Sequence, residues 1–219
     1  KQDKGKITEG IFAPWAIYKS DFQSIGGHDS LYAPQSKEDS DIFNRFVLAG
    51  YKLVQTWEGF VYHMTCRGSR FADGAKRNPN GEVFMKNRET DEWLQQNHRS
   101  TRNFIRKWGH FVKHDAFMKP IVPPKYDIGF VIKNCNYELL YELEPWCSDI
   151  YAGIDTGFVY TLKKYIENEQ DNTIFNLNQK IHNYTENKNN DIIIEFDGTE
   201  FTPEQFNYLA NLSEILTND

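Results

Sequence analysis

Apolar side chains recur with two different periods along this chain, and each period predicts one type of element. Between residues 39 and 49 they return every three or four positions and Gly50 follows, which predicts a helix with a glycine cap at its C-terminus. Further helices are expected at residues 19–24, 90–117, 137–143 and 158–168, and from Thr202 to near residue 216. Strands are expected at residues 10–18, 52–63 (as a strand pair or a bent strand), 126–133, 149–153 and 191–197.

The order of these elements predicts a mixed α/β protein in two parts. Residues 126–153 have a strand, helix, strand pattern, and the intervening length suits a helical crossover. The two consecutive prolines Pro123 and Pro124 stop a helix and hold the chain extended, so we expect a boundary within residues 121–125. The expected domains are therefore residues 1–120 and a small acidic α/β domain of unknown role at residues 125–219.

Composition limits the class of protein. The chain has 219 residues, of which 39% are hydrophobic, so it can bury a core. Its three cysteines are widely spaced, which predicts neither a disulfide framework nor a zinc ribbon and favours a reducing, cytoplasmic location. No apolar run is long enough to cross a bilayer, and residues 1–9 do not read as a signal peptide. The absence of an initial methionine leads us to expect a piece, natural or engineered, of a longer protein.

The charge is divided unevenly along the chain. Residues 1–124 carry 19 Lys and Arg against 14 Asp and Glu, a formal charge of +5, whereas residues 125–219 carry 6 against 17, a formal charge of −11. The basic first part suits ligands that bear phosphate, and the acidic second part argues against nucleic acid or an anionic membrane as its partner. Equally, the opposite charges could serve only to dock the two parts together.

Two adjacent carboxylates stand at the start of the helix predicted at residues 39–49. Glu38 and Asp39 would meet the positive end of the helix dipole there, which keeps carboxylates ionised. Such residues usually cap a helix, but a carboxylate held in this way is also what is needed to deprotonate a hydroxyl group. A sugar transfer from a nucleotide diphosphate needs that base together with a cation that stabilises the departing diphosphate.

The neighbouring motifs favour the chemical interpretation. The order is a strand at residues 12–18, a helix with Asp21-Phe22, the turn Ile25-Gly26-Gly27-His28-Asp29, the motif Lys37-Glu38-Asp39-Ser40-Asp41, then Arg45, Gly50-Tyr51, a strand and His63. Over roughly residues 10–110 this order resembles the second, acceptor-side half of a family 2, GT-A-type glycosyltransferase domain. The resemblance implies an inverting, metal-dependent transfer of a sugar from a nucleotide-diphosphate sugar to an acceptor hydroxyl.

The resemblance also implies roles for single residues of this chain. Asp39 would be the catalytic base and Glu38 its partner or an acceptor-binding group, while His63 would bind Mn²⁺ or Mg²⁺. The acceptor would lie against Gly26, Gly27, His28 and Trp15, and the diphosphate against Arg67 and Arg70. Each has a plainer alternative: Trp15 as a core residue, His63 as a packed or surface residue, and the two arginines as solvated loop charges.

One required part of the family pattern is not found in this sequence. The upstream nucleotide-binding half, with its Asp-x-Asp motif, would have to come from outside this chain, which we therefore expect to be inactive or nearly so by itself. A non-catalytic interaction protein that retains part of the glycosyltransferase fold is the main alternative. A nucleic-acid-binding module that uses the basic residues 99–113 is less favoured, because the chain is acidic overall. The donor sugar, the acceptor and the oligomeric state do not follow from the sequence.

Overall fold

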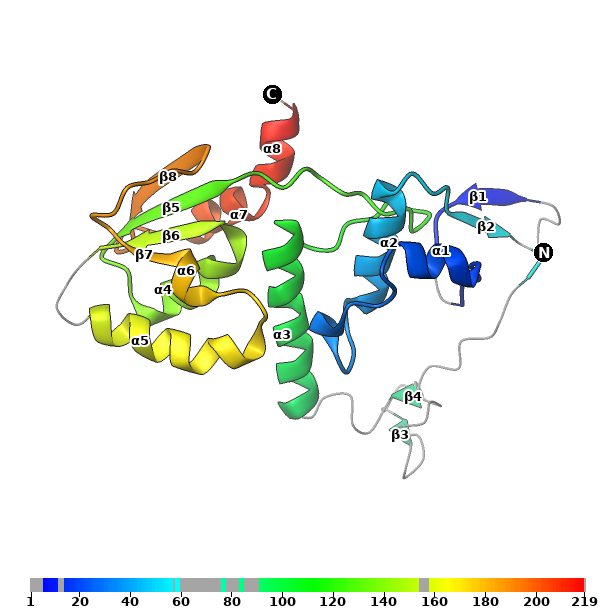
Figure 1. Cartoon of the computed structure of the whole chain (residues 1–219), viewed down its shortest axis with the longest axis horizontal. Coiled ribbons are helices and arrows are strands. Elements are labelled where there is room, and N and C mark those ends of the chain that lie inside the picture. Colours follow the sequence, from blue (N-terminus) through cyan, green and yellow to red (C-terminus); the bar gives the residue numbers. More distant parts are fainter. Residues whose placement is uncertain are drawn as a thin grey trace. The chain divides into compact units, whose positions relative to one another are not determined.

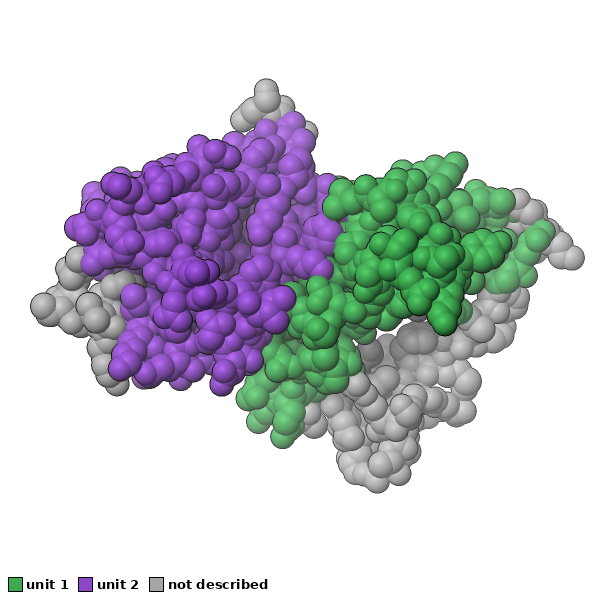
Figure 2. All heavy atoms as spheres, viewed as in Figure 1, with its two compact units in different colours: residues 1–100, 114–121 green, residues 101–113, 122–219 purple. Residues whose placement is uncertain are grey.

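The protein is a mixed α/β molecule whose described residues fall into two compact units. The computed structural model describes residues 6–11, 14–56, 58–59, 76–77, 83–84, 91–153 and 158–218. Unit 1 comprises residues 1–100 and 114–121, and unit 2 comprises residues 101–113 and 122–219 (Figure 2). Neither unit is one continuous piece of chain. The domains expected at residues 1–120 and 125–219 stay a prediction.

Unit 1 is built mainly from short helices and two-stranded sheets. Its elements are β1 (Ile7–Glu9), α1 (Lys19–Ser24), the 3₁₀ turn η1 (Ser30–Tyr32), α2 (Glu38–Leu48), β2 (Val54–Thr56), β3 (Lys76–Arg77), β4 (Val83–Phe84) and the first part of α3 (Asp91–Trp108) (Figure 1). β1 pairs with β2 and β3 with β4, both antiparallel. The core of the unit is formed by Ile42, Phe43 and Phe46, which lie on one face of α2 because their spacing matches the helical period. α2 therefore organises the packing of this unit.

Unit 2 contains a four-stranded parallel sheet. Its elements are β5 (Ile128–Lys133), α4 (Tyr137–Leu143), η2 (Glu144–Trp146), β6 (Asp149–Ala152), α5 (Phe158–Glu169), η3 (Gln170–Asn172), α6 (Leu177–Lys180), β7 (Ile181–Asn183), β8 (Ile192–Asp197), α7 (Pro203–Ala210) and α8 (Leu212–Asn218). The strand order is β7-β6-β5-β8, and every pair is parallel. Such pairs need crossover connections, which α4 supplies between β5 and β6.

One face of this sheet carries the hydrophobic core of unit 2. Phe130 on β5 is in register with Ile150 on β6 and with Ile194 on β8, so their side chains leave the sheet on the same side. They belong to one cluster with apolar residues of α4, α5 and α7, which lie on that side of the sheet (Figure 1). Burial of this cluster is expected to be the main favourable contribution to the folding free energy of unit 2.

The opposite face of the sheet is more polar. It carries Tyr151, stacked on His182 of the neighbouring strand with 4.9 Å between ring centroids. Gly129 lies on the same face, and a Cβ atom there would stand 2.4 Å from Asn190 Oδ1. The connection between β7 and β8 therefore covers this face so closely that a side chain at position 129 would displace the Asn190 amide.

A network of buried charges joins the second part of α3 to the rest of unit 2. Arg106 Nη2 contacts Glu144 Oε2 and Glu169 Oε1, each at 2.6 Å, and Arg102 Nε donates to Glu169 Oε1 at 2.9 Å. Lys180 Nζ adds a contact with Glu144 Oε1 at 2.8 Å. Burial would raise the pKa of Glu144, but Lys180 and Arg106 together hold it well below its ordinary range.

Several predicted elements are confirmed. α1 and α4 have the predicted bounds, α2 begins one residue earlier than expected, and Gly50 follows it with a φ of 81°. The mixed α/β class is also confirmed, with four parallel strands and eight α-helices among the described residues. No helix in these ranges combines the length and apolar content that a membrane crossing requires.

Other predicted elements are wrong. α3 ends at Trp108, because Gly109 adopts a left-handed φ of 78°, rather than continuing to residue 117. Residues 14–18 are not assigned to a strand, and the expected final helix is divided at Asn211 into α7 and α8. α6 and β7 are not among the predicted elements, because they are four and three residues long, too short to show a period.

Removal of one guanidinium group should test the buried charge network. Arg106→Met would leave Glu144 and Glu169 with less compensation in a dry environment, so we expect a loss of about 3–5 kcal/mol in the free energy of unfolding of unit 2. Urea unfolding followed by circular dichroism measures this loss. Lys163→Met is the matched control, because Lys163 pairs with Glu167 at 3.9 Å on the surface and should cost less than about 1 kcal/mol. Equal losses in the two variants would contradict a stabilising role for the network.

The pH dependence of stability should include a contribution from His110. This side chain is only 1% exposed, and burial lowers its pKa, although its hydrogen bond with the Phe111 carbonyl opposes the shift. Because the unfolded chain then binds a proton more readily than the folded protein, stability should fall as the pH drops below about 6.5, by up to about 1.4 kcal/mol per pH unit. His110→Gln, which does not titrate, should show a shallower decline between pH 7 and 5 in urea unfolding. An unchanged slope would exclude this contribution.

Candidate functional site

The chain enters α2 through two residues in an unusual conformation. Ser36 and Lys37 have φ values of 79° and 74°, in the left-handed region that residues with a side chain seldom occupy. Lys37 is the N-cap of α2, and its side chain forms no cap hydrogen bond. Such strain persists only where surrounding structure imposes it, and it is concentrated at functional sites. The two residues precede Glu38 and Asp39 directly.

The first part of α3 holds this entry segment in place. Gln96 Nε2 donates to the carbonyls of Ala33 and Gln35, at 3.2 and 3.0 Å, and Ser100 Oγ donates to the Gln35 carbonyl at 3.1 Å. Arg99 Nη2 also donates to the Ala33 carbonyl, at 2.9 Å. These side chains satisfy backbone groups of a loop that has no regular secondary structure of its own. The start of α2 is thereby fixed within unit 1.

The two predicted acidic residues have different environments. Asp39 is exposed in the first turn of α2, and in the described part of the chain its carboxylate has neither an ion pair nor a hydrogen bond. It is therefore open to a ligand. Glu38 is half-buried, and its Oε2 atom is buried without a hydrogen-bond partner among the described residues. Burial lowers the pKa of the adjacent Lys37, while Glu38 opposes that shift.

The glycine turn that was assigned to the acceptor lies at the end of α1. Gly26 and Gly27 have φ values of 87° and 66°, and their N–H groups donate to the carbonyls of Gln23 and Phe22, at 3.0 and 2.9 Å. A Cβ atom on Gly27 would lie 3.1 Å from the Phe22 ring. Glycine is thus required here by both conformation and space.

Arg45 connects this turn to α2. Its Nε and Nη2 atoms contact Asp41 Oδ2, at 2.9 and 2.8 Å, within the same helix. On its other side, Nη1 donates to the Ile25 carbonyl and Nη2 donates to the Gly27 carbonyl at 2.6 Å. The Asp41 side chain is fully buried and that of Arg45 is 19% exposed, so these contacts are largely shielded from water. The turn and the helix that carries Glu38 and Asp39 are therefore held together.

Trp15 belongs to an aromatic cluster with the predicted acceptor residue His28. The indole lies 6.2 Å from the His28 ring and 5.8 Å from the Phe43 ring, both edge to face, and 6.2 Å from Phe22. Phe22 itself lies 5.5 Å from His28. Trp15 is half-buried, so the alternative of a core residue holds for the part of its ring that packs on α2.

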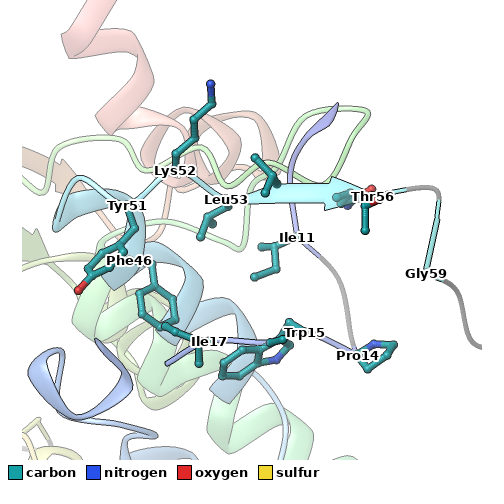
Figure 3. Close-up of a pocket in the computed structure, with 13 residues that line it drawn as sticks. Ile11, Pro14, Trp15, Ile17, Phe46, Tyr51, Lys52, Leu53, Thr56 and Gly59 are labelled. Carbon is teal, nitrogen blue, oxygen red and sulfur yellow. The ribbon is translucent and has the colours of Figure 1, made fainter. Parts of the chain in front are cut away.

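Trp15 also lines a pocket of about 720 Å³ in unit 1, a volume typical of small-ligand sites (Figure 3). Trp15 and Ile17 border one side of it, and Leu53 and Thr56 another (Figure 3). The lining is mostly apolar. Since Trp15 contacts both this space and His28, the pocket and the glycine turn share one side chain.

The remaining predicted site residues lie outside the described residues. These are His63, Arg67 and Arg70. Within the described ranges no group of three or more His, Cys, Asp and Glu side chains could hold a metal ion. The expected Mn²⁺ or Mg²⁺ site thus stays a prediction.

Asp41, the residue that fixes Arg45, is not among the site residues predicted from the sequence. Its spacing of four from Arg45 indicates an ion pair along a helix, which is a visible signal. The two carbonyls bound by Arg45 have no such signal, because they lie 18 and 20 residues away in the chain.

A second pocket, of about 610 Å³, lies in unit 2 near Asp149, His182 and Glu186. His182 Nε2 is 2.9 Å from Asp149 Oδ1, and Asn190 Nδ2 donates to Asp149 Oδ2 at 2.6 Å. Glu186 Oε1 accepts from the Asn183 N–H at 2.7 Å. These groups satisfy one another, so the pocket is weaker as a candidate site than the region around Asp39.

A scan against protein-family models found no match, and searches of curated proteins and of solved structures found no significant similarity.

Substitution of the two left-handed glycines should separate strain from crowding. Gly27→Ala and Gly50→Ala each place a side chain at positive φ, at a cost of about 1–2 kcal/mol. A Cβ atom on Gly50 meets no atom within 4 Å, whereas on Gly27 it meets the Phe22 ring, which should add about 1 kcal/mol. Thermal melting of both variants beside the unaltered protein measures the difference. Equal costs would show that Phe22 does not constrain the turn.

Proposed function

We propose that this chain is the acceptor-side part of an inverting, metal-dependent glycosyltransferase. The observation that carries the proposal is the link made by Arg45 between the Gly26-Gly27 turn and α2, whose first turn presents Asp39. The motifs that resemble the acceptor loop and the Glu-Asp motif of family 2 enzymes thus belong to one hydrogen-bonded arrangement. Motifs that lay far apart within unit 1 would not support a common site.

Asp39 is the proposed catalytic base. Its exposed carboxylate would accept the proton of the acceptor hydroxyl while that oxygen forms a bond to the anomeric carbon of the donor sugar. The bond from the anomeric carbon to the diphosphate breaks on the opposite face, so configuration inverts and nucleoside diphosphate leaves with the electron pair. Asp39 needs to be open to solvent for this step, and its place in the first turn of α2 leaves it exposed.

The rest of the site has supporting roles in this proposal. The acceptor would lie between Trp15, His28 and the glycine turn, where an aromatic surface and backbone groups are available. Glu38 would assist Asp39 or bind the acceptor. His63, Arg67 and Arg70 would hold a divalent cation and the diphosphate, and a bound Mn²⁺ or Mg²⁺ would supply neutralisation of the charge on the leaving group.

The proposal requires a nucleotide-binding half from outside residues 1–219. This half would bind the nucleotide-sugar donor and complete the metal site. The alternative is an interaction protein without catalysis that retains part of the same fold. Its distinguishing property is the absence of donor turnover even when the missing half is present.

Turnover in a completed domain tests the proposal. We would measure Mn²⁺-dependent release of nucleoside diphosphate from a panel of sugar nucleotides, with this chain joined to a nucleotide-binding half. Asp39→Asn keeps the shape of the side chain but removes the base, so release should fall by about 10²–10⁴-fold. His63→Ala should weaken the dependence on Mn²⁺.

Asp115→Asn is a suitable control, since Asp115 bonds its own loop at residues 117–119. It should leave release unchanged. No release from any donor by a folded protein would favour the interaction protein, and full activity of Asp39→Asn would reject Asp39 as the base.

A further inference from the structure

Arg45 bridges α2 and the glycine turn by hydrogen bonds. Its guanidinium group is planar and has donors on both sides, so it can bind one carboxylate and two carbonyls at once. Asp41 fixes one side of the group, and the carbonyls of Ile25 and Gly27 occupy the other. The turn therefore receives its orientation from the helix.

The bond to Gly27 has a consequence for the next residue. The peptide bond between Gly27 and His28 is trans, so the Gly27 carbonyl and the His28 N–H point in opposite directions. With the carbonyl directed at Arg45, the N–H is directed away from Arg45. Within the described residues that N–H has no acceptor, and His28 is exposed. The His28 N–H is thus an oriented hydrogen-bond donor without an acceptor among the described residues.

We propose that Arg45 is a positioning residue for the acceptor: by holding the Gly27 carbonyl, it directs the His28 N–H toward an oxygen atom of the acceptor substrate. This inference rests on the proposed glycosyltransferase function. An acceptor substrate that bears hydroxyl groups offers suitable oxygens. Because the His28 N–H is already oriented, no conformational entropy is lost in orienting it when the substrate binds. Loss of Arg45 should therefore weaken acceptor binding more than it slows the chemical step.

Asp41 also helps to hold the glycine turn on α2. Its side chain is fully buried, and Tyr32 donates to its Oδ1 atom at 3.3 Å. Tyr32, at 1% exposure, ends the short turn η1, which follows the glycine turn. Asp41 thus contacts Arg45 on one side and the segment after the turn on the other, which fixes both ends of residues 25–32 to α2.

Amide hydrogen exchange tests the positioning step without any substrate. In Arg45→Lys the charge remains, but one ammonium group cannot bind the Asp41 carboxylate and both turn carbonyls at once. The turn should then open more often, so the Gly26 and Gly27 amides should exchange about tenfold faster. Arg99→Met is the matched control, because Arg99 also donates to a backbone carbonyl of unit 1, that of Ala33. It should leave residues 25–28 unchanged. Unchanged exchange in Arg45→Lys, or faster exchange throughout unit 1, would overturn the inference.

A second variant guards against a general loss of stability. The double variant Asp41→Asn, Arg45→Met removes both charges and leaves no buried ion unpaired. It should show the same faster exchange at Gly26 and Gly27 as Arg45→Lys while α2 keeps its protection. Slow exchange of the turn in this double variant would show that the pair does not orient it.

Steady-state kinetics of the completed domain tests the link to the acceptor. Arg45→Lys should raise the KM for the acceptor about tenfold, with a smaller change in kcat and an unchanged KM for the donor. Guanidinium chloride at a low, non-denaturing concentration should partly restore the acceptor KM of Arg45→Ala. An unchanged acceptor KM in an active enzyme would overturn this inference and leave the proposed function intact. No turnover by the unaltered domain would instead reject the proposed function, whatever the exchange rates show.

Discussion

A guanidinium group that is removed from water must have its N–H donors satisfied by nearby acceptors, and both units of this protein depend on that requirement. In unit 2, Arg102 and Arg106 fasten the second part of α3 to Glu144 and Glu169. In unit 1, Arg45 satisfies the same requirement with Asp41 and two backbone carbonyls. The desolvation cost makes each arrangement specific, because an incomplete set of partners would leave a buried charge uncompensated.

The candidate site combines this rigid support with local strain. Ser36 and Lys37 hold left-handed conformations immediately before Asp39, and hydrogen bonds from α3 keep their loop in place. Asp39 thus stands at a fixed helix end, whereas its carboxylate remains free of partners in the described residues. The position of this side chain therefore does not depend on bonds made by its own carboxylate.

Much of the local structure could be predicted, because its causes lie close together in the sequence. α4 follows from its apolar spacing and its Asn136 cap, and α2 from its apolar spacing and the glycine at position 50. The Glu38-Asp39 pair can be read directly from the sequence. The end of α3 at Gly109 was missed because its helical pattern of basic residues suggested a longer helix. For the site, the i, i+4 pair of Asp41 and Arg45 can be read from the sequence. The carbonyls of the turn cannot, since backbone acceptors carry no residue identity and only the fold brings them to Arg45.

Residues 114–121 pack against Gly10 and Ile11, near the beginning of the chain. A Cβ atom on Gly10 would lie 1.9 Å from the Phe117 carbonyl oxygen, and the Ile11 N–H donates to the Met118 carbonyl at 3.4 Å. Residues 114–121 therefore belong with the beginning of the chain, although residues 101–113 belong to unit 2. The polypeptide passes from one unit to the other three times, so no single cleavage can release either unit whole. A protease therefore cannot separate the two units by one cut, and a gene fusion cannot transfer one complete unit as a single continuous segment.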